Sequence, residues 1–213
     1  ENFSAAGDFL GTRAFVDREK IGVIGICGSG GFAVAATKID PRIKALATVS
    51  MYDMGEYFRT GLNHERTVDM RNKDLLTAAE QRYKTAETGQ PVYGPGQNDP
   101  VFIEGKESND FYQTERGKVP SNDRRTTPAT YAKFMNFHPF IDIQSISPRP
   151  ILFVVGEVAP SRTYTDTAYK MAAEPKELVE IKGANRIDLY DRTELIPWDK
   201  LVSFFNTSLN TSK

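Results

Sequence analysis

The stretch from Ile21 to Asp40, IGVIGICGSGGFAVAATKID, constrains the fold more than any other part of the chain. It opens with a continuous apolar run at 21–27, which is typical of a strand covered on both faces of a parallel sheet. A glycine-rich corner follows, and the next run, GGFAVAATKI, has the pattern of a helix. A strand, a tight corner and a helix in this order predict an α/β fold with right-handed crossovers.

Three more strands are predicted from the apolar runs at 43–51, 150–157 and 177–184. Helix patterns follow the predicted strands at 150–157 and 177–184. Thr165 is the expected N-cap of the helix that follows 150–157. Strands that alternate with helices in this way predict a parallel three-layer α/β/α sheet.

A long segment, about Tyr52 to Ser147, separates the second and third predicted strands. It is too long for a plain loop in a compact domain and contains two amphipathic helix patterns, so we expect a largely helical lid. The predicted organisation is a first half of the α/β core at 1–53, the lid insertion at 54–147 and a second half of the core at 148–213. Aromatic residues at helical spacing in the insertion indicate a core more than a substrate pocket; they are Tyr57, Phe58, Phe102, Phe111, Tyr112, Tyr131, Phe134, Phe137 and Phe140.

The composition excludes several classes of function. Lys and Arg number 27 against 28 Asp and Glu, a net charge of -1, so no basic excess exists to bind nucleic acid or an anionic membrane. One cysteine rules out an intramolecular disulfide, and two histidines argue against a histidine-rich metal site. We therefore expect a cytoplasmic protein without a metal or another cofactor.

The corner GICGSG, Gly25 to Gly30, fits the pattern of a nucleophile elbow with a cysteine at its apex. In this tight turn the residues two before and two after the apex must be small, and Gly25 and Ser29 occupy those positions. Cys27 would then lie at a helix N-terminus, which favours the thiolate form of its side chain. The N–H group of Gly28 would supply one donor of an oxyanion hole.

Two other interpretations of the corner remain open at this stage. Free cysteine is among the most frequently buried residue types, so Cys27 could be a structural thiol. A glycine-rich turn between a strand and a helix could also bind phosphate, although this one lacks the Lys and Ser/Thr of a P-loop.

The segment DREKIGVIGICGSGGFAVAATKIDPRIKALATVSMYDMG resembles the α/β-hydrolase superfamily in its dienelactone-hydrolase-like branch. In that branch the pattern G-x-C-x-G carries a cysteine nucleophile. The later segments RPILFVVGE and KGANRIDLYD and a final amphipathic helix are similar to the rest of the family pattern. The resemblance implies strands 5 to 8 of the family fold and a hydrolase of carboxylic esters or lactones.

The resemblance also implies a histidine base after the last strand, and Arg186 occupies that position. A guanidinium stays protonated at any working pH, so Arg186 cannot take a proton from the thiol or from water. The two histidines, His64 and His138, lie in the insertion, where a surface or packing role is the ordinary explanation. We therefore expect acyl transfer to Cys27 with impaired turnover.

The remaining site residues are predicted from their positions near strand ends. The family acid follows the strand before the base, and Glu157 is the nearest carboxylate there, with Asp166 as the next candidate. Met51 and Tyr52 end the second strand, and ligands bind at that end of parallel sheets, so they are the expected substrate-binding residues.

Two expectations concern the protein as a whole. Because Arg186 replaces the base, the alternative to an enzyme is a non-catalytic α/β-hydrolase-fold protein that binds a ligand or a partner. The resemblance lacks the first four family strands, which would leave the apolar strand at 21–27 as an open edge. We expect an N-terminal segment of the same fold, or a second copy of the chain, to cover that edge.

Overall fold

The computed structural model describes residues 1–93, 110–112, 114–119 and 126–210. The chain forms two compact units. The core unit comprises residues 1–53 and 138–213, and the helical unit comprises Met54–Phe137. The helical unit therefore begins where the predicted insertion begins, whereas residues 138–147 belong to the core unit.

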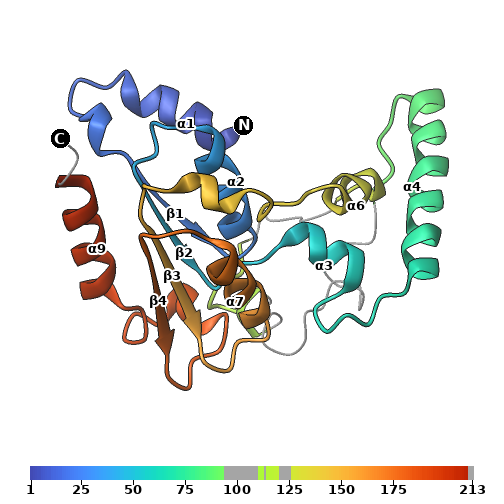
Figure 1. Ribbon diagram of the computed structural model, residues 1–213. Coiled ribbons are helices and arrows are strands. Elements are labelled where there is room, and N and C mark those ends of the chain that lie inside the picture. Colours follow the sequence, from blue (N-terminus) through green and yellow to red (C-terminus); the bar gives the residue numbers. More distant parts are fainter. Residues whose placement is uncertain (94–109, 113, 120–125, 211–213) are drawn as a thin grey trace. The chain divides into compact units, whose positions relative to one another are not determined.

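A sheet of four parallel strands, in the order of the chain, forms the centre of the core unit (Figure 1). The described strands are β1 (Gly22–Ile26), β2 (Ala45–Val49), β3 (Ile151–Gly156) and β4 (Lys176–Ile181). Each predicted strand is present within a few residues of its expected place. The predicted α/β fold is confirmed.

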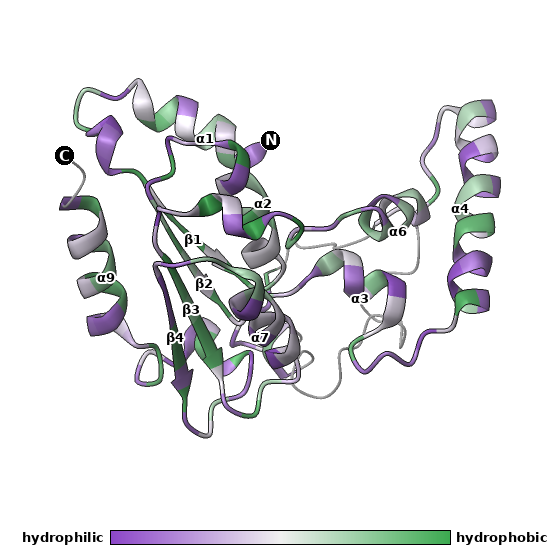
Figure 2. Ribbon diagram, in the orientation of Figure 1, coloured by the Kyte–Doolittle hydropathy of each residue, from purple (hydrophilic) through white to green (hydrophobic). Residues whose placement is uncertain are grey.

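Helices cover both faces of this sheet (Figure 1). Alternate residues of β2 and β3, such as Val49 and Val154, pack with Leu201 and Phe204 of α9 (Trp198–Asn210). Helices α2 (Gly28–Ile39) and α7 (Arg162–Met171) contact the sheet from the opposite side. Both central strands are buried along their whole length, as their apolar sequences predict, and Figure 2 shows them as hydrophobic.

The core unit contains four further helical elements among its described residues. They are α1 (Asn2–Gly11), the 3-10 helices η1 (Arg18–Lys20) and η3 (Ile143–Ile146), and α8 (Asp188–Asp191). The prediction of Thr165 as an N-cap is wrong, because α7 begins one turn earlier with Ser161 as its N-cap. Thr165 lies inside α7 and is fully buried, since the turn after β3 is shorter than the sequence suggested.

The helical unit contains α3 (Met54–Thr60), α4 (Val68–Thr88) and α6 (Pro128–Met135) among its described residues. Thr67 caps α4 by accepting the N–H of Met70, and Gly89 ends it at a φ of 68°. The ring of Phe58 stacks with those of Tyr131 and Phe134 at centroid distances of 5.1 Å each, so these aromatic residues form a small core. Of the other predicted aromatic residues, Phe140 belongs to the core unit and Phe102 lies outside the described residues.

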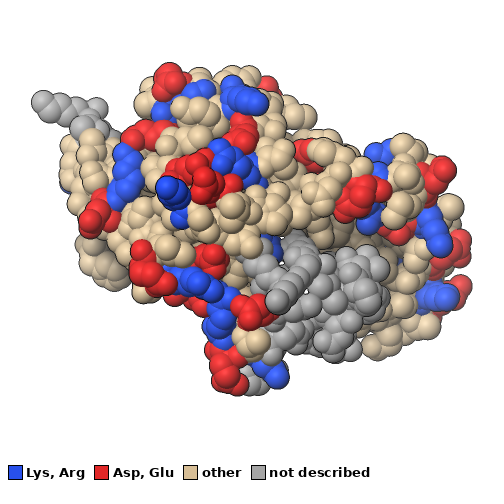
Figure 3. Space-filling view, turned by 90° about the horizontal axis from the view of Figure 1, so that it is seen from below, with Lys and Arg blue, Asp and Glu red and all other residues tan. Residues whose placement is uncertain are grey.

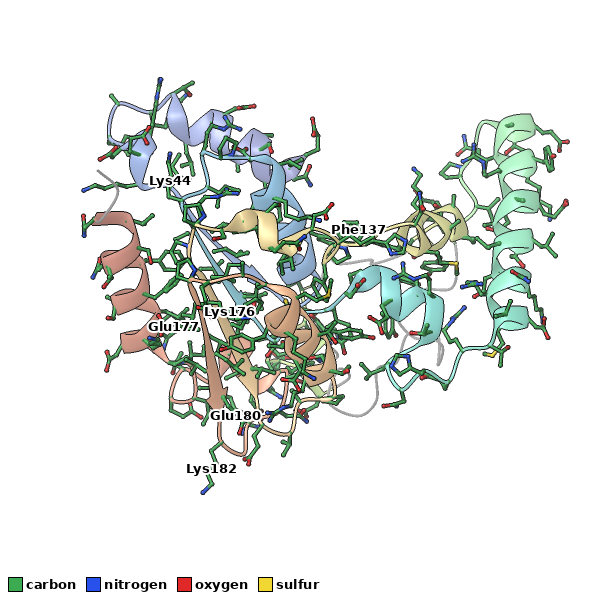
Figure 4. The ribbon with its side chains drawn as sticks, viewed as in Figure 1. Lys44, Phe137, Lys176, Glu177, Glu180 and Lys182 are labelled. Atoms are coloured by element: carbon green, nitrogen blue, oxygen red, sulfur yellow. The ribbon has the colours of Figure 1, made fainter. Side chains whose placement is uncertain are left out.

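The two outer strands differ in the side chains that they expose. Ile24 and Ile26 of β1 are 46% and 44% exposed, although a β-sheet core normally buries such residues. The outer strand β4 instead carries Lys176, Glu177 and Glu180, whose side chains are labelled in Figure 4.

Charged groups of both signs are interspersed over the face of the molecule seen in Figure 3. This distribution agrees with the net charge of -1. In the part of the chain that the structure describes, no helix combines the length and the apolar character needed to cross a membrane.

Candidate active site

Cys27 occupies the corner between β1 and α2 in a strained backbone conformation. Its φ and ψ are 58° and −129°, a region that residues with a Cβ atom rarely adopt. Three hydrogen bonds hold this conformation. The Cys27 N–H donates to the carbonyl of Val49 at 3.0 Å, and the Cys27 carbonyl accepts from Gly30 at 2.9 Å and from Tyr52 at 3.0 Å. Strain of this kind persists only where the surrounding structure imposes it.

Two glycines make the corner possible because no side chain fits at their positions. A Cβ atom on Gly25 would lie 2.5 Å from the carbonyl oxygen of Ser29, and one on Gly30 would lie 2.2 Å from the Cβ of Met51. The small residue two positions before the apex is therefore a steric requirement. Gly30 brings the start of α2 against the end of β2. These contacts explain the glycine pattern that marked the corner in the sequence.

Arg186 comes from the connection between β4 and α8 and reaches the same corner. Its side chain is buried, with 1% of the residue exposed, and its Nη1 lies 3.9 Å from the Sγ of Cys27. This distance is within the range for a hydrogen bond to sulfur. The structure therefore brings together Cys27 and Arg186, the predicted nucleophile and the residue predicted at the position of the base.

The loop that carries Arg186 is fixed by its own hydrogen bonds. The N–H of Arg186 donates to Asn185 Oδ1, and the N–H of Asn185 donates to Asp188 Oδ2, both at 2.9 Å. Ser50 Oγ donates to the carbonyl of Arg186 at 2.9 Å and ties this loop to the end of β2. The parallel register places the ends of β1 and β2 side by side, with Ile26 opposite Val49, so residues distant in sequence meet here.

The chemistry of the Cys27–Arg186 pair is that of a thiol beside a fixed positive charge. A guanidinium donates hydrogen bonds and attracts a thiolate, but it has no lone pair that accepts a proton. Gly28 is the first residue of α2, and the first N–H groups of a helix have no intrahelical acceptor. The corner therefore places a sulfur atom beside a positive charge and beside the N–H donors at the start of α2.

Glu157 and Asp166 lie in different surroundings. The carboxylate of Glu157 accepts the N–H of Gly183 at 2.7 Å, and its carbonyl accepts from Arg162 at 3.4 Å. Arg162 also pairs with Asp166 at 3.4 Å and with Glu180. Through Gly183, the carboxylate of Glu157 anchors the same β4–α8 connection that carries Arg186.

The predicted substrate-binding residues lie directly after β2. Met51 is completely buried with its Cβ against Gly30, and Tyr52 is 1% exposed. The ring of Tyr52 lies 5.1 Å from the guanidinium carbon of Arg186, a distance at which a cation–π interaction forms.

Sequence reasoning missed three buried residues of this region. Ser50, with a φ of 47°, bonds to Arg186, and Asp53 is a carboxylate with 5% exposure. Tyr164 of α7 packs against Tyr52 at a ring distance of 5.2 Å. The only sequence signal for Ser50 and Asp53 was their place in SMYD, directly after a buried strand.

The two histidines are both exposed, as the surface role expected for them requires. His64 is an exposed residue of the helical unit and lies 3.9 Å from Glu56, and His138 is also exposed. Within the described ranges, no cluster of three or more His, Cys, Asp or Glu residues could hold a metal ion.

Comparison with known proteins gives the class of the chain. No family model matches it. The hypothetical protein PA2218 from Pseudomonas aeruginosa is 44% identical over 98% of this chain and 58% of its own length. Its crystal structure superposes with a TM-score of 0.91 at 43% identity, covering 98% of this chain and 67% of that chain.

Two fungal proteins are more distant relatives. The structure of the α/β hydrolase GrgF from Penicillium sp. sh18 has a TM-score of 0.80 at 20% identity, over 98% of this chain and 71% of that chain. By sequence, polyketide transferase GrgF is 28% identical over 81% of this chain and 57% of its own length. Thiohydrolase AneE from Aspergillus aculeatus is 25% identical over 78% of this chain and 55% of its own length.

The sheet, the elbow and these similarities define an α/β-hydrolase-fold protein. Within that class, the chain belongs to the family of PA2218. The chain spans 55–64% of the length of the curated relatives that it matches.

Proposed function

We propose that the protein acts on carboxylic esters or lactones and forms a thioester on Cys27. The observation that carries this proposal is the Sγ of Cys27, held at a strained elbow with Arg186 Nη1 3.9 Å away. Strain and a buried charge at one place are features of functional sites, because neither stabilises the fold by itself.

In the first step the Cys27 thiolate attacks the carbonyl carbon of the ester. The S–C bond forms, and the carbonyl oxygen takes the negative charge and accepts a hydrogen bond from the Gly28 N–H. The tetrahedral intermediate then expels the alcohol oxygen as an alkoxide, which takes a proton from water. The products are an acyl thioester on Cys27 and a free alcohol, or a ring-opened hydroxyl group when the substrate is a lactone.

The second step, hydrolysis of the thioester, needs a base that removes a proton from water. Arg186 occupies the position of that base and cannot perform this role. We therefore propose that the acyl-enzyme accumulates. Glu157 would act as the acid that orients the β4–α8 connection, through its bond to Gly183. Substrate contacts by Met51 and Tyr52 and a lid at residues 54–147 remain predictions.

The names of the relatives agree with acyl chemistry of this kind. One relative is named a thiohydrolase, another a polyketide transferase and a third an acyltransferase. The dienelactone-hydrolase-like branch is our finer assignment, based on the cysteine at the elbow. The proposed chemistry requires a reduced Cys27, which a cytoplasmic location would provide.

The test is intact-mass spectrometry of the full-length protein after mixing with an activated acetate ester. We expect one acetyl adduct, located at Cys27 by peptide mapping and lost in Cys27→Ala. Arg186→His should accelerate loss of the adduct by about 10²-fold or more, the usual contribution of a general base. A protein that gains no adduct at Cys27 is not an acyl transferase or hydrolase of this type. In that case the better assignment is a non-catalytic binding role, which is favoured by an arginine, and not a histidine, at position 186.

We also propose that a further strand pairs with β1, supplied by an N-terminal segment of the same fold or by a second copy of the chain. The exposed Ile24 and Ile26 support this proposal, because a bare apolar edge strand promotes aggregation. Size-exclusion chromatography of the 213-residue chain tests it. A well-behaved monomer would argue against an edge that needs a partner.

A further inference from the structure

Two residues of the short connection after β2 contact Arg186. The hydroxyl of Ser50 binds the backbone carbonyl of Arg186, and the ring of Tyr52 lies against the guanidinium. An arginine side chain has many rotamers, so a charge at the end of it needs a second contact to stay in one position. The Tyr52 ring is such a contact, 5.1 Å from the guanidinium carbon.

Tyr52 is at the same time fixed to the other member of the pair. Its backbone N–H donates to the carbonyl of Cys27 at 3.0 Å. Its ring packs against Tyr164 of α7 at 5.2 Å and an interplanar angle of 40°, and the whole residue is 1% exposed. Tyr52 therefore contacts the elbow through its backbone and the guanidinium through its ring.

We infer that Tyr52 is a positioning residue, which holds the positive charge of Arg186 beside the sulfur of Cys27 through a cation–π interaction. This inference rests on the proposed function of Cys27 as the nucleophile. It gives Tyr52 a role that differs from substrate contact: the ring acts on the thiol through Arg186. The face of the ring carries the partial negative charge that attracts a guanidinium, so the ring and not the hydroxyl performs this role.

The experiment compares alkylation of Cys27 by iodoacetate and by iodoacetamide in the full-length protein. The two reagents transfer similar groups to sulfur with loss of iodide, but iodoacetate is anionic and its approach is favoured by a nearby positive charge. The ratio of the two rates therefore reports where the guanidinium lies, and it does not depend on turnover. Arg186→Met gives the value of this ratio without the charge.

We expect Tyr52→Leu to lower the rate ratio about threefold or more, towards the Arg186→Met value, because the cation–π contact of a buried pair is lost. Tyr52→Phe keeps the ring and should keep the ratio. A ratio that is unchanged in Tyr52→Leu overturns the inference. An equal fall in Tyr52→Phe and Tyr52→Leu also overturns it, since the hydroxyl would then be the group that matters.

A second series covers the case in which Tyr52→Leu does not fold. Phenylalanine analogues with increasing fluorination at position 52 keep the shape of the ring and progressively remove the negative charge of its face. The rate ratio should fall stepwise along this series, and a flat series contradicts the inference. If no acetyl adduct forms but the alkylation ratios change as expected, the proposed acyl chemistry is rejected, while the placement of the Arg186 charge by the Tyr52 ring still holds.

Discussion

The two outer strands of the sheet, β1 and β4, differ in the chemistry of the side chains that they expose. Each has a strand neighbour on one side only among the described residues. On β4, Lys176, Glu177 and Glu180 place charges along the edge, which is a common protection against pairing with other chains. On β1, Ile24 and Ile26 are apolar and nearly half exposed. The sequence of β4 is suited to solvent, and that of β1 is suited to a partner.

The two residues of the candidate site, Cys27 and Arg186, follow these same two strands. β1 runs into the strained elbow with Cys27, and β4 runs into the connection with Arg186. The elbow is crowded, whereas Gly183 in the turn after β4 has open space where a Cβ atom would lie. A Cβ atom added at Gly25, just before the elbow, should therefore destabilise the fold more than one added at Gly183 in the turn after β4.

The largest expected effect is that of Gly25→Ala at the elbow. The new Cβ would meet the backbone oxygen of Ser29 at 2.5 Å, and backbone atoms cannot move aside as a side chain can. We expect a loss of about 3 kcal/mol or more in the free energy of unfolding, measured by urea denaturation.

The matched control is Gly183→Ala in the turn after β4. Gly183 has a φ of 68° but open space around it, so only backbone strain opposes the alanine. We expect a loss of about 1 kcal/mol. Equal losses in the two variants would show that backbone conformation, and not crowding, governs the elbow.

Much of this contrast could be predicted from the sequence because it is local. The run of Val, Ile and Gly before Cys27 indicated the strand, and the glycines indicated the tight corner. The sequence also predicted that Arg186 occupies the position of the base. The structure adds the distance of 3.9 Å between the two side chains.

The supporting contacts could not be predicted, because they join elements far apart in the chain. Nothing near Tyr52 in sequence indicates that its ring meets Arg186 and Tyr164. Ser50 has a positive φ without being glycine, and such strain is imposed by tertiary packing. For Thr165 the sequence predicted a feature that the structure does not have. Threonine is a good N-cap residue, but tertiary packing makes α7 begin earlier, and Thr165 therefore lies inside the helix.

The next largest effect is expected for Ile24→Lys in the full-length protein. If a further strand covers β1, the ammonium group would be buried beside it, and we expect a loss of about 2–3 kcal/mol in thermal or urea unfolding. Ile24→Thr, which keeps a β-branched side chain, is the control and should cost less than about 1.5 kcal/mol. A change near zero for Ile24→Lys would mean that the edge of β1 stays in water.

A smaller effect is expected from Asp40, in the connection between α2 and β2. Its carboxylate accepts two hydrogen bonds from the Arg42 guanidinium, at 2.8 and 2.7 Å, which lower the pKa of Asp40 to about 2. Because the folded pKa lies below the unfolded value of about 3.9, the stabilisation is complete above pH 4 and is lost as the pH falls towards 2.

We therefore expect Asp40→Asn to lower the free energy of unfolding by about 1–2 kcal/mol at neutral pH. The difference from the natural protein should shrink between pH 4 and pH 2, in urea titrations at each pH. Glu174→Gln, at the exposed turn before β4, is the control and should change stability by less than about 0.5 kcal/mol. A difference that is constant with pH would mean that the charge of Asp40 does not stabilise the fold.

The smallest effect is expected on β4, where Glu177 pairs with Lys200 of α9. The two side chains are 50% and 38% exposed, so water and salt screen their attraction. Glu177→Gln should lower the free energy of unfolding by about 0.5 kcal/mol at low salt and by less at high salt. A loss above about 1.5 kcal/mol, unaffected by salt, would show that the pair stabilises the fold. If the loss in the free energy of unfolding is as small as expected, the charged side chains of β4 keep its edge in solvent and contribute little to stability. The strand β1 has no such charged side chains.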